Sequence, residues 1–386
     1  MKYDFDTIIP RRGSGCVKWD CPDKDILPMW VADMDFKAAP CIMDSLRRRV
    51  EHGVFGYTLV PDSYYAAIRD WFISRHGWEI ATDSVIYTSG VVPAISAIIK
   101  AMTAPGDKVI VLSPVYNCFF SSIRNNKCDV ADVPLTFHPD GYTIDFEALA
   151  AAAADPRASV LLLCNPHNPV GRVWTRDELL RIADICRDNG VFVISDEIHC
   201  ELTYTGHDYT PYNTLGAEYA AHSAVCISPS KAFNIAGLQI ANIVAVDPAV
   251  RQRIDRAIND NEVCDVNPFG VTALIAAYRE GADWLNALRD YLYHNYLYVR
   301  DFFAEKFPDF PILPLQGTYL VWIDCSATGL SSDILSQKLI DEERLMLNAG
   351  VMYGNGGEHF LRLNIACPRA TLTEGLERLG RFLSRF

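Results

Sequence analysis

One lysine, placed directly after a strand-like stretch, has the side chain and position for covalent catalysis. Lys231 ends the segment Ser228-Pro229-Ser230-Lys231, at the end of the strand candidate 225–228. A lysine amine attacks a carbonyl carbon and forms a Schiff base only when it is deprotonated, so its surroundings must lower its pKa. A lone lysine in such a place is more often a solvated surface residue. The hydroxyls of Ser228 and Ser230 favour the catalytic interpretation, because they could hold a phosphate beside the amine.

A carboxylate follows another apolar run in the same way. Asp196 ends the run 191–196 and begins the segment Asp196-Glu197-Ile198-His199. A carboxylate at the end of a buried strand is costly unless it meets a cation. One interpretation is a helix cap. The other is that Asp196 keeps a pyridinium nitrogen protonated, with His199 near a phenolic oxygen of the same ring.

Three further segments have the composition of ligand-binding turns and strands. The loop 165–171, with two Asn-Pro pairs, is first of all a turn, but a rigid one that presents Asn168. Ser89-Gly90-Val91-Val92 is a glycine turn that opens a helix, where free N–H groups bind phosphate. Arg362 lies in the strand-like run 360–364 and is either an exposed charge or a bidentate clamp for a carboxylate.

The elements that must position these residues alternate between strands and helices. Apolar, β-branched runs of strand length occupy 84–89, 108–113, 159–164 and 191–196. Helix-like stretches separate them, one opened by the capping box Thr175-x-x-Glu178. This alternation predicts an α/β fold with a mostly parallel sheet between helices, and ligands then bind at the carboxyl ends of the strands. From about residue 271 the pattern changes to a long helix over 282–306, strands 319–324 and 360–366, and a last helix 371–386, which indicates a smaller α+β unit.

Composition narrows the classes of partner. The 386 residues carry a net charge of −13, which disfavours nucleic acids and anionic membranes, and Arg47–Arg49 is interpreted as a solvated helix face. No run approaches 18 apolar residues, and the N-terminus has no apolar signal region. The 12 cysteines form no C-x-x-C pair and no metal-ligand spacing. We therefore expect no metal and a cytoplasmic location.

Taken together, these segments resemble the pyridoxal-phosphate-dependent enzymes of fold type I, the class I/II aminotransferase superfamily. The motifs that carry the resemblance are SPVYNCFF, NPHNPVGRVW, SDEIHCEL, SPSKAFNIAGLQ and YGNGGEHFLRLN, spread from 113 to 364. A narrower set, FDTIIPRRGSGCVKWD, LPMWVADMDF, VFGYT and RLNIACPR, looks like the carbon–sulfur β-lyase branch, the cystathionine β-lyases of the MalY/PatB type.

The resemblance implies a cofactor, pyridoxal 5'-phosphate, and a role for each site residue. Lys231 would carry the cofactor, Asp196 would pair with its ring nitrogen and be held ionised with a lowered pKa, and Tyr116 would stack on the ring. Arg362, with Asn168, would hold the substrate carboxylate. The other cofactor contacts implied are Gly90, Val91, Val92, Asn168, His199, Ser228 and Ser230. Tyr57 would reach the phosphate of the other subunit, so a homodimer is implied.

The resemblance also implies a large α/β domain over 45–280 and a small α+β domain from 1–44 together with 281–386. The sheet of the large domain would be mostly parallel and of the seven-stranded type. Two departures stand out. Gln239 takes the place of an arginine that neutralises the phosphate in many members, and the stretch 14–16 is looser than is usual for the lyase branch.

The leading functional hypothesis is α,β-elimination on cystathionine or another S-substituted L-cysteine, which yields a thiol, pyruvate and ammonia. Trp30, Tyr57 and Tyr116 suggest an aromatic pocket that accepts a thioether. The first alternative is an aminotransferase, which shares nearly all these motifs. The second is a non-catalytic binding or regulatory protein on the same fold, although such a protein would not need Lys231, Asp196 and Arg362 together.

Overall fold

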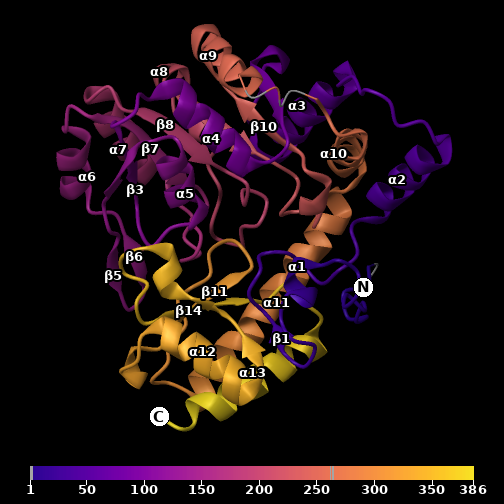
Figure 1. Ribbon diagram of the computed structural model, residues 1–386, viewed down its shortest axis with the longest axis vertical. Helices are drawn as coiled ribbons and strands as arrows, with labels where there is room; N and C mark the ends of the chain where they lie inside the picture. The colour runs from indigo at the N-terminus through magenta and orange to yellow at the C-terminus, as the bar shows by residue number, and fades with distance from the viewer. Residues whose placement is uncertain (1–2, 261, 263–264) are drawn as a thin grey trace.

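A seven-stranded sheet forms the centre of the computed structural model, which describes residues 3–260, 262 and 265–386 (Figure 1). Its order is β2-β10-β9-β8-β7-β3-β4, and all neighbouring pairs are parallel except those of β10. The strands are β2 (Val85–Thr88), β3 (Lys108–Val111), β4 (Asp129–Asp132), β7 (Ala158–Cys164), β8 (Phe192–Asp196), β9 (Ser223–Ile227) and β10 (Ala241–Val244). The predicted α/β fold with a mostly parallel sheet is confirmed.

The central strands are apolar throughout because helices cover both faces of the sheet. In β7, Leu161 and Leu163 belong to one core, whereas Val160 and Leu162 belong to the core on the opposite face. The second core lies under α4 (Val91–Met102), α5 (Cys118–Asn125) and α9 (Pro248–Asn259). On the other face lie helices such as α6 (Phe146–Ala153) and α7 (Arg176–Asp188), and α7 begins with the predicted capping box at Thr175. Burial on both faces is what selects near-continuous apolar strands in a parallel sheet.

The C-terminal part of the chain forms a second, antiparallel sheet of three strands. It consists of β11 (Leu320–Asp324), β14 (Phe360–Asn364) and β13 (Asn348–Ala349), in that order. Helices α11 (Ala282–Lys306), α12 (Ser332–Glu343) and α13 (Arg369–Leu383) surround it (Figure 1). The predicted long helix over 282–306 is therefore present as α11.

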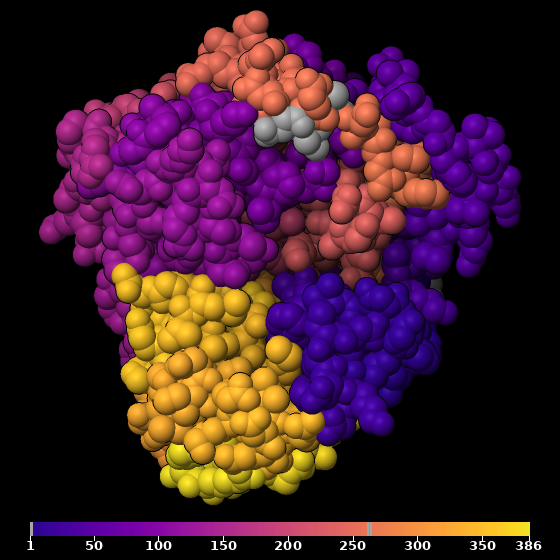
Figure 2. All heavy atoms as spheres, in the orientation of Figure 1, coloured from indigo at the N-terminus to yellow at the C-terminus, as the bar shows by residue number. Residues whose placement is uncertain are grey.

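The N-terminal residues, which periodicity does not place, lie against this C-terminal part. Strand β1 (Leu27–Pro28) pairs in parallel with β12 (Leu345–Met346). Figure 2 shows the indigo N-terminal residues and the yellow C-terminal residues side by side below the purple body that holds the large sheet. Between β1 and α2 (Pro40–His52) the chain runs in irregular backbone. Helices α2 and α3 (Asp62–His76) then both contact α10 (Pro268–Glu280). None of the helices described is long and apolar enough to span a bilayer.

Candidate active site

The carboxyl ends of several parallel strands open into one cavity of about 420 Å³. Chain segments that follow β2, β3, β7, β8 and β9 all contribute to its wall, and residues 30–32 and the C-terminal part close it from the other side. In Figure 2 a hollow lies where the purple body meets the yellow and indigo parts. The site residues predicted from the sequence that line the cavity are Gly90, Val91, Val92, Tyr116, Asn168, Asp196, His199, Ser230, Lys231 and Arg362.

Lys231 presents its amine to this cavity from the turn that follows β9. Its Nζ donates a 2.6 Å hydrogen bond to the carbonyl oxygen of Ala32. Burial, together with the nearby guanidinium of Arg362, lowers the pKa of Lys231 to about 8. A substantial share of the amine is therefore neutral near physiological pH, which is the condition for nucleophilic attack or proton abstraction.

Asp196 ends β8 and is buried, with only 3% of its surface exposed. Among the described residues, one hydrogen bond reaches its carboxylate, a 3.1 Å bond from the N–H of Ile198. Burial raises the pKa of Asp196 to about 7, and that hydrogen bond and the charge of Lys231 offset the rise only in part. The expected lowered pKa applies to Asp196 beside a protonated ring nitrogen, and it stays a prediction. In the protein alone the chain supplies too little positive charge at this carboxylate to lower its pKa.

Tyr116 and His199 also line the cavity. Burial raises the pKa of the Tyr116 hydroxyl well above its usual value, and the neighbouring Cys118 thiol adds to the rise. Burial, with Lys231 and Arg362 nearby, lowers the pKa of His199 far below its usual range. The Nδ1 of His199 has no hydrogen-bond partner among the described residues. The site therefore holds a neutral imidazole with one nitrogen available to a ligand.

The first turn of α4 offers backbone N–H groups to the cavity. Gly90 precedes this 12-residue helix, and no side chain among the described residues caps its N-terminus. Val91 and Val92 line the cavity there, close to the end of the helix that attracts negative charge. Ser230 also lines the cavity, but Ser228 does not. The Ser228 hydroxyl lies behind it, 2.6 Å from the carbonyl oxygen of Ile240, and accepts the Ser230 N–H at 3.1 Å, so it shapes the turn.

Arg362 enters the cavity from β14, with 3% of its surface exposed. Its Nη1 donates to Asn168 Oδ1 at 3.0 Å, and its Nη2 donates to the carbonyl oxygen of Trp30 at 2.9 Å. The guanidinium carbon lies 5.0 Å from the ring centre of Tyr353. Its Nε has no partner within the described part of the chain. This is a fixed, buried cation with unused donor capacity, as a carboxylate site requires.

Tyr57 does not reach this cavity in its own chain. It lies in the loop between α2 and α3, where 98% of its surface is exposed. Its neighbours Val54, Phe55 and Leu59 are also more than half exposed. A contiguous run of exposed apolar side chains is typical of an association surface.

Several lining residues were not predicted from the sequence. Ala32, Cys118, Asn348, Met352 and Tyr353 belong to this group. Asn348 donates to the Trp30 carbonyl at 3.0 Å and to the Tyr353 hydroxyl at 2.9 Å. Ala32, Cys118 and Tyr353 lie inside the motifs that carry the family resemblance, which was the one signal that could have identified them. Asn348 and Met352 lie in short elements without a periodic pattern.

Comparisons with known proteins agree with this geometry. The family model "Aminotransferase class I and II" matches residues 25–379. Cystathionine beta-lyase PatB of Bacillus subtilis is 40% identical over 386 residues, which is 99% of this chain and 100% of PatB. Protein MalY of Escherichia coli is 36% identical and covers 98% of each chain. The crystal structure of cystalysin from Treponema denticola superposes with a TM-score of 0.97 at 35% identity over the whole of both chains. The chain therefore belongs to the aminotransferase class I and II family and, within it, to the branch of PatB and MalY.

Proposed function

We propose that this protein is a pyridoxal-phosphate-dependent carbon–sulfur β-lyase that acts on cystathionine or other S-substituted L-cysteines. The observation that carries the proposal is the convergence of Lys231, Asp196 and Arg362 on one cavity in a chain 40% identical to a cystathionine β-lyase. The cystalysin structure contains pyridoxal 5'-phosphate, which supports the choice of cofactor. The products would be a thiol, pyruvate and ammonia.

The chain's own groups fit this cofactor. Asp196 is a buried carboxylate that lacks positive charge, and a protonated ring nitrogen would supply it. The free N-terminus of α4 and the Ser230 hydroxyl suit a phosphate. The unpartnered His199 Nδ1 and the amide of Asn168 also belong to residues that line the cavity, and these two side chains would hold a ring oxygen while Tyr116 would stack on the ring. Gln239 is exposed, so we assign no phosphate contact to it.

When bound, pyridoxal phosphate withdraws electrons from the Cα of a joined amino acid and makes its proton acidic. Lys231 is the group placed to take that proton, because its lowered pKa leaves a neutral amine. The electron pair then forms the Cα–Cβ double bond while the Cβ–S bond breaks, and the sulfur leaves as a thiolate. The remaining enamine reacts with water to give pyruvate and ammonia.

Arg362 would fix the substrate by its carboxylate and so direct Cα toward the amine. The guanidinium is held by Asn168 and by the Trp30 carbonyl, so it needs little reorganisation to bind an anion. Trp30, Met352 and Tyr353 form a largely apolar wall beside it. Such a wall accepts a thioether and holds water away from the reacting carbon.

The exposed loop at Tyr57 supports a homodimer in which that tyrosine completes the partner's phosphate site. Its 98% exposure is unusual for an aromatic residue and fits a side chain that is buried only on association. We also propose that residues 45–280 form the large domain and that residues 1–44 with 281–386 form the small one. The pairing of β1 with β12 supports the second grouping. In keeping with this function, we expect a cytoplasmic enzyme.

The test is release of pyruvate and free thiol from L-cystathionine with added pyridoxal phosphate. Wild type and the surface variant Lys338→Ala, whose lysine side chain is 46% exposed, should release both products. Lys231→Ala should release neither at a measurable rate. Equal activity of Lys231→Ala and wild type would overturn the assignment of the lysine. Transfer of the amino group to an added 2-oxo acid, without pyruvate release in its absence, would make the protein an aminotransferase.

A further inference from the structure

Residues 30–35 belong to no helix or strand, yet side chains fix their backbone at every step. Each carbonyl from Trp30 to Met34 accepts a hydrogen bond from a side chain. The donors are Arg362 and Asn348 for Trp30, Asn364 for Val31, Lys231 and Tyr319 for Ala32, Asn364 and Lys18 for Asp33, and Arg11 and Asn234 for Met34. Irregular backbone has no regular ladder of its own, so these side chains order it together with a few backbone bonds, such as that from the Asp35 N–H to the Ala366 carbonyl oxygen at 2.9 Å.

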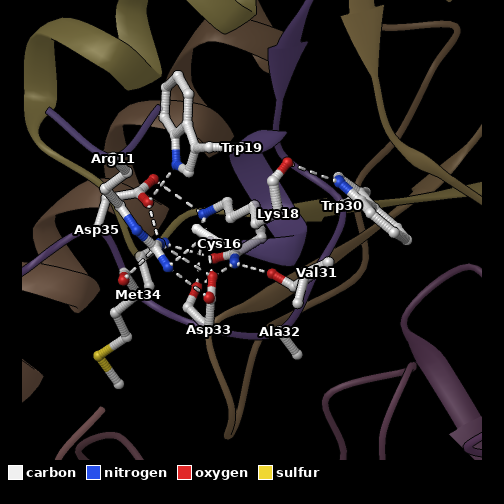
Figure 3. A network of polar contacts seen from close by, with 12 residues as sticks. Arg11, Cys16, Lys18, Trp19, Trp30, Val31, Ala32, Asp33, Met34 and Asp35 are labelled. Carbon is white, nitrogen blue, oxygen red and sulfur yellow. Dashed lines mark hydrogen bonds and ion pairs between the residues drawn. The ribbon is translucent and has the colours of Figure 1, made fainter. Parts of the chain in front are cut away.

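A cluster of four charged side chains, Arg11, Lys18, Asp33 and Asp35, holds this segment (Figure 3), and none of the four lines the cavity. Asp35 is its centre and receives Lys18 Nζ at 2.8 Å, Arg11 Nη1 at 2.6 Å and the indole N–H of Trp19 at 2.8 Å. Arg11 also donates hydrogen bonds to both carboxylate oxygens of Asp33, from Nη1 at 3.2 Å and from Nη2 at 2.7 Å. Lys18 and Asp35 are 1% and 5% exposed. Two cations and two carboxylates balance, which is the condition for burying charge at tolerable cost.

The same segment contacts the Lys231 amine through one carbonyl oxygen. The carbonyl oxygen of Ala32 accepts the Lys231 amine at 2.6 Å and the Tyr319 hydroxyl at 2.9 Å. These two donors use both lone pairs of the oxygen. A neutral lysine amine has two N–H bonds and one lone pair. A fixed acceptor for one N–H therefore restricts the direction in which the lone pair points.

We propose that the buried cluster of Arg11, Lys18, Asp33 and Asp35 is a positioning device, which fixes residues 30–35 so that the Ala32 carbonyl orients the Lys231 amine toward the substrate Cα. The cluster residues do not contact the substrate. They act through the backbone that they hold. The inference rests on the proposed function only for its kinetic consequence, because the contact between Ala32 and Lys231 belongs to the protein itself.

The variant that tests it is the double substitution Lys18→Met with Asp35→Asn, which removes one cation and one anion and keeps the cluster neutral. With L-cystathionine, kcat should fall about tenfold or more, because the Ala32 carbonyl no longer orients the Lys231 amine toward the substrate Cα. KM should rise by a smaller factor than kcat falls, because Arg362 keeps its bond to Asn168 even if its second acceptor, the Trp30 carbonyl of this segment, is displaced. A loss of global stability alone would not produce this split at a temperature well below unfolding.

A second measurement uses the cofactor-free protein. Lys231 is methylated with formaldehyde and cyanoborohydride at alkaline pH, and the modified peptide is quantified by mass spectrometry. The double variant should react several-fold faster than wild type, because the amine is no longer held by Ala32. If the double variant fails to fold, Trp19→Phe removes a single bond to Asp35 and should lower kcat about threefold.

The matched control is Arg344→Gln. Arg344 ties Asp25, in the same N-terminal region, to the C-terminal part at 2.8 Å, but it does not touch residues 30–35. Its kcat and its Lys231 labelling should equal those of wild type. Wild-type kcat and wild-type labelling in the double variant would overturn the positioning role. If wild type itself releases no pyruvate, the proposed function fails, whereas the labelling comparison still decides the positioning role.

Discussion

Arg362 Nη1 lies 3.0 Å from Asn168 Oδ1, so a strand of the C-terminal sheet is bonded to the loop that follows β7 in the large sheet. Both side chains are buried, at 3% and 4% exposure. The bond keeps a guanidinium in place across the boundary between the two sheets. Binding of an anion there therefore depends on both parts of the chain being correctly placed.

Arg362→Lys should reduce kcat/KM about 10- to 100-fold, mainly through KM. Lysine keeps the charge but loses the planar fork that reaches Asn168, Trp30 and a carboxylate together, and hydrogen bonds to charged groups contribute about 1.5–3 kcal/mol each. Steady-state kinetics with L-cystathionine measures this change. Arg344→Lys, at a solvent-exposed ion pair, is the control and should behave as wild type. An unchanged KM in Arg362→Lys would show that the carboxylate binds elsewhere.

Asp196→Asn should stabilise the cofactor-free protein at neutral pH but not in acid. The folded pKa of about 7 lies above the ordinary value of 3.8, so ionisation favours the unfolded chain as pH rises from about 4 to 7. Replacing the Asp196 carboxyl with an amide should raise the free energy of unfolding by at most about 4 kcal/mol at pH 8 and hardly at all at pH 4.

Urea unfolding of cofactor-free wild type and variant at both pH values measures this difference. Asp184→Asn, at a half-exposed carboxylate, should show no comparable pH dependence. With cofactor bound, the order should reverse, because Asp196 then has a cationic partner. A difference that does not change with pH would contradict the burial effect on Asp196.

The rate at which the cofactor-free protein takes up pyridoxal phosphate should rise with pH and level off above about pH 8. Below its folded pKa, Lys231 is protonated and cannot attack the carbonyl. Four groups act on this amine, of which Arg362 lowers its pKa and Asp33, Asp196 and Cys118 raise it. Arg362→Gln should therefore move the midpoint upward.

Absorbance change after mixing measures the rate of uptake. The same reaction with a lysine model amide corrects for ionisation of the cofactor itself. A corrected midpoint near 10, the range of an exposed lysine, would contradict the low pKa assigned to Lys231.

The variants Tyr57→Ala and Lys231→Ala should complement each other when one chain of each forms a mixed dimer. Tyr57→Ala should weaken the partner's cofactor site, and Lys231→Ala should remove catalysis. In a mixed dimer of the two, one site has an intact Lys231 and receives an intact Tyr57 from its partner. Unfolding and refolding the two chains together, with each chain refolded alone as the control, should raise activity above that of either homodimer. No gain, in a sample shown by sedimentation to contain mixed dimers, would place Tyr57 outside the partner's site.

Position at the end of a strand, together with the family resemblance, predicted which residues meet at the cavity. Asp196 ends a parallel strand, and Lys231 and Asn168 follow two others, so the sheet brings the three residues to one edge. The mostly parallel sheet was also predictable, because strands buried on both faces are near-continuous apolar runs without polar alternation.

The remaining features depend on tertiary packing. The place of residues 30–35 has no periodic signal, since side chains from distant segments order that backbone. The raised pKa of Asp196 in the protein alone depends on its depth of burial, which outweighs the charges that the chain supplies. Ser228 resembles a cavity residue in sequence but lies behind Ser230, because its hydroxyl is used by Ile240.

The central claim is that this site eliminates a thiol and does not transfer an amino group, and the number of turnovers without a 2-oxo acid tests it most directly. Holoenzyme is mixed with excess L-cystathionine, and pyruvate is followed over time. We predict linear release that far exceeds the amount of enzyme, with thiol and ammonia formed in equal amounts. A burst no larger than one equivalent of enzyme, followed by turnover only after a 2-oxo acid is added, would contradict the account.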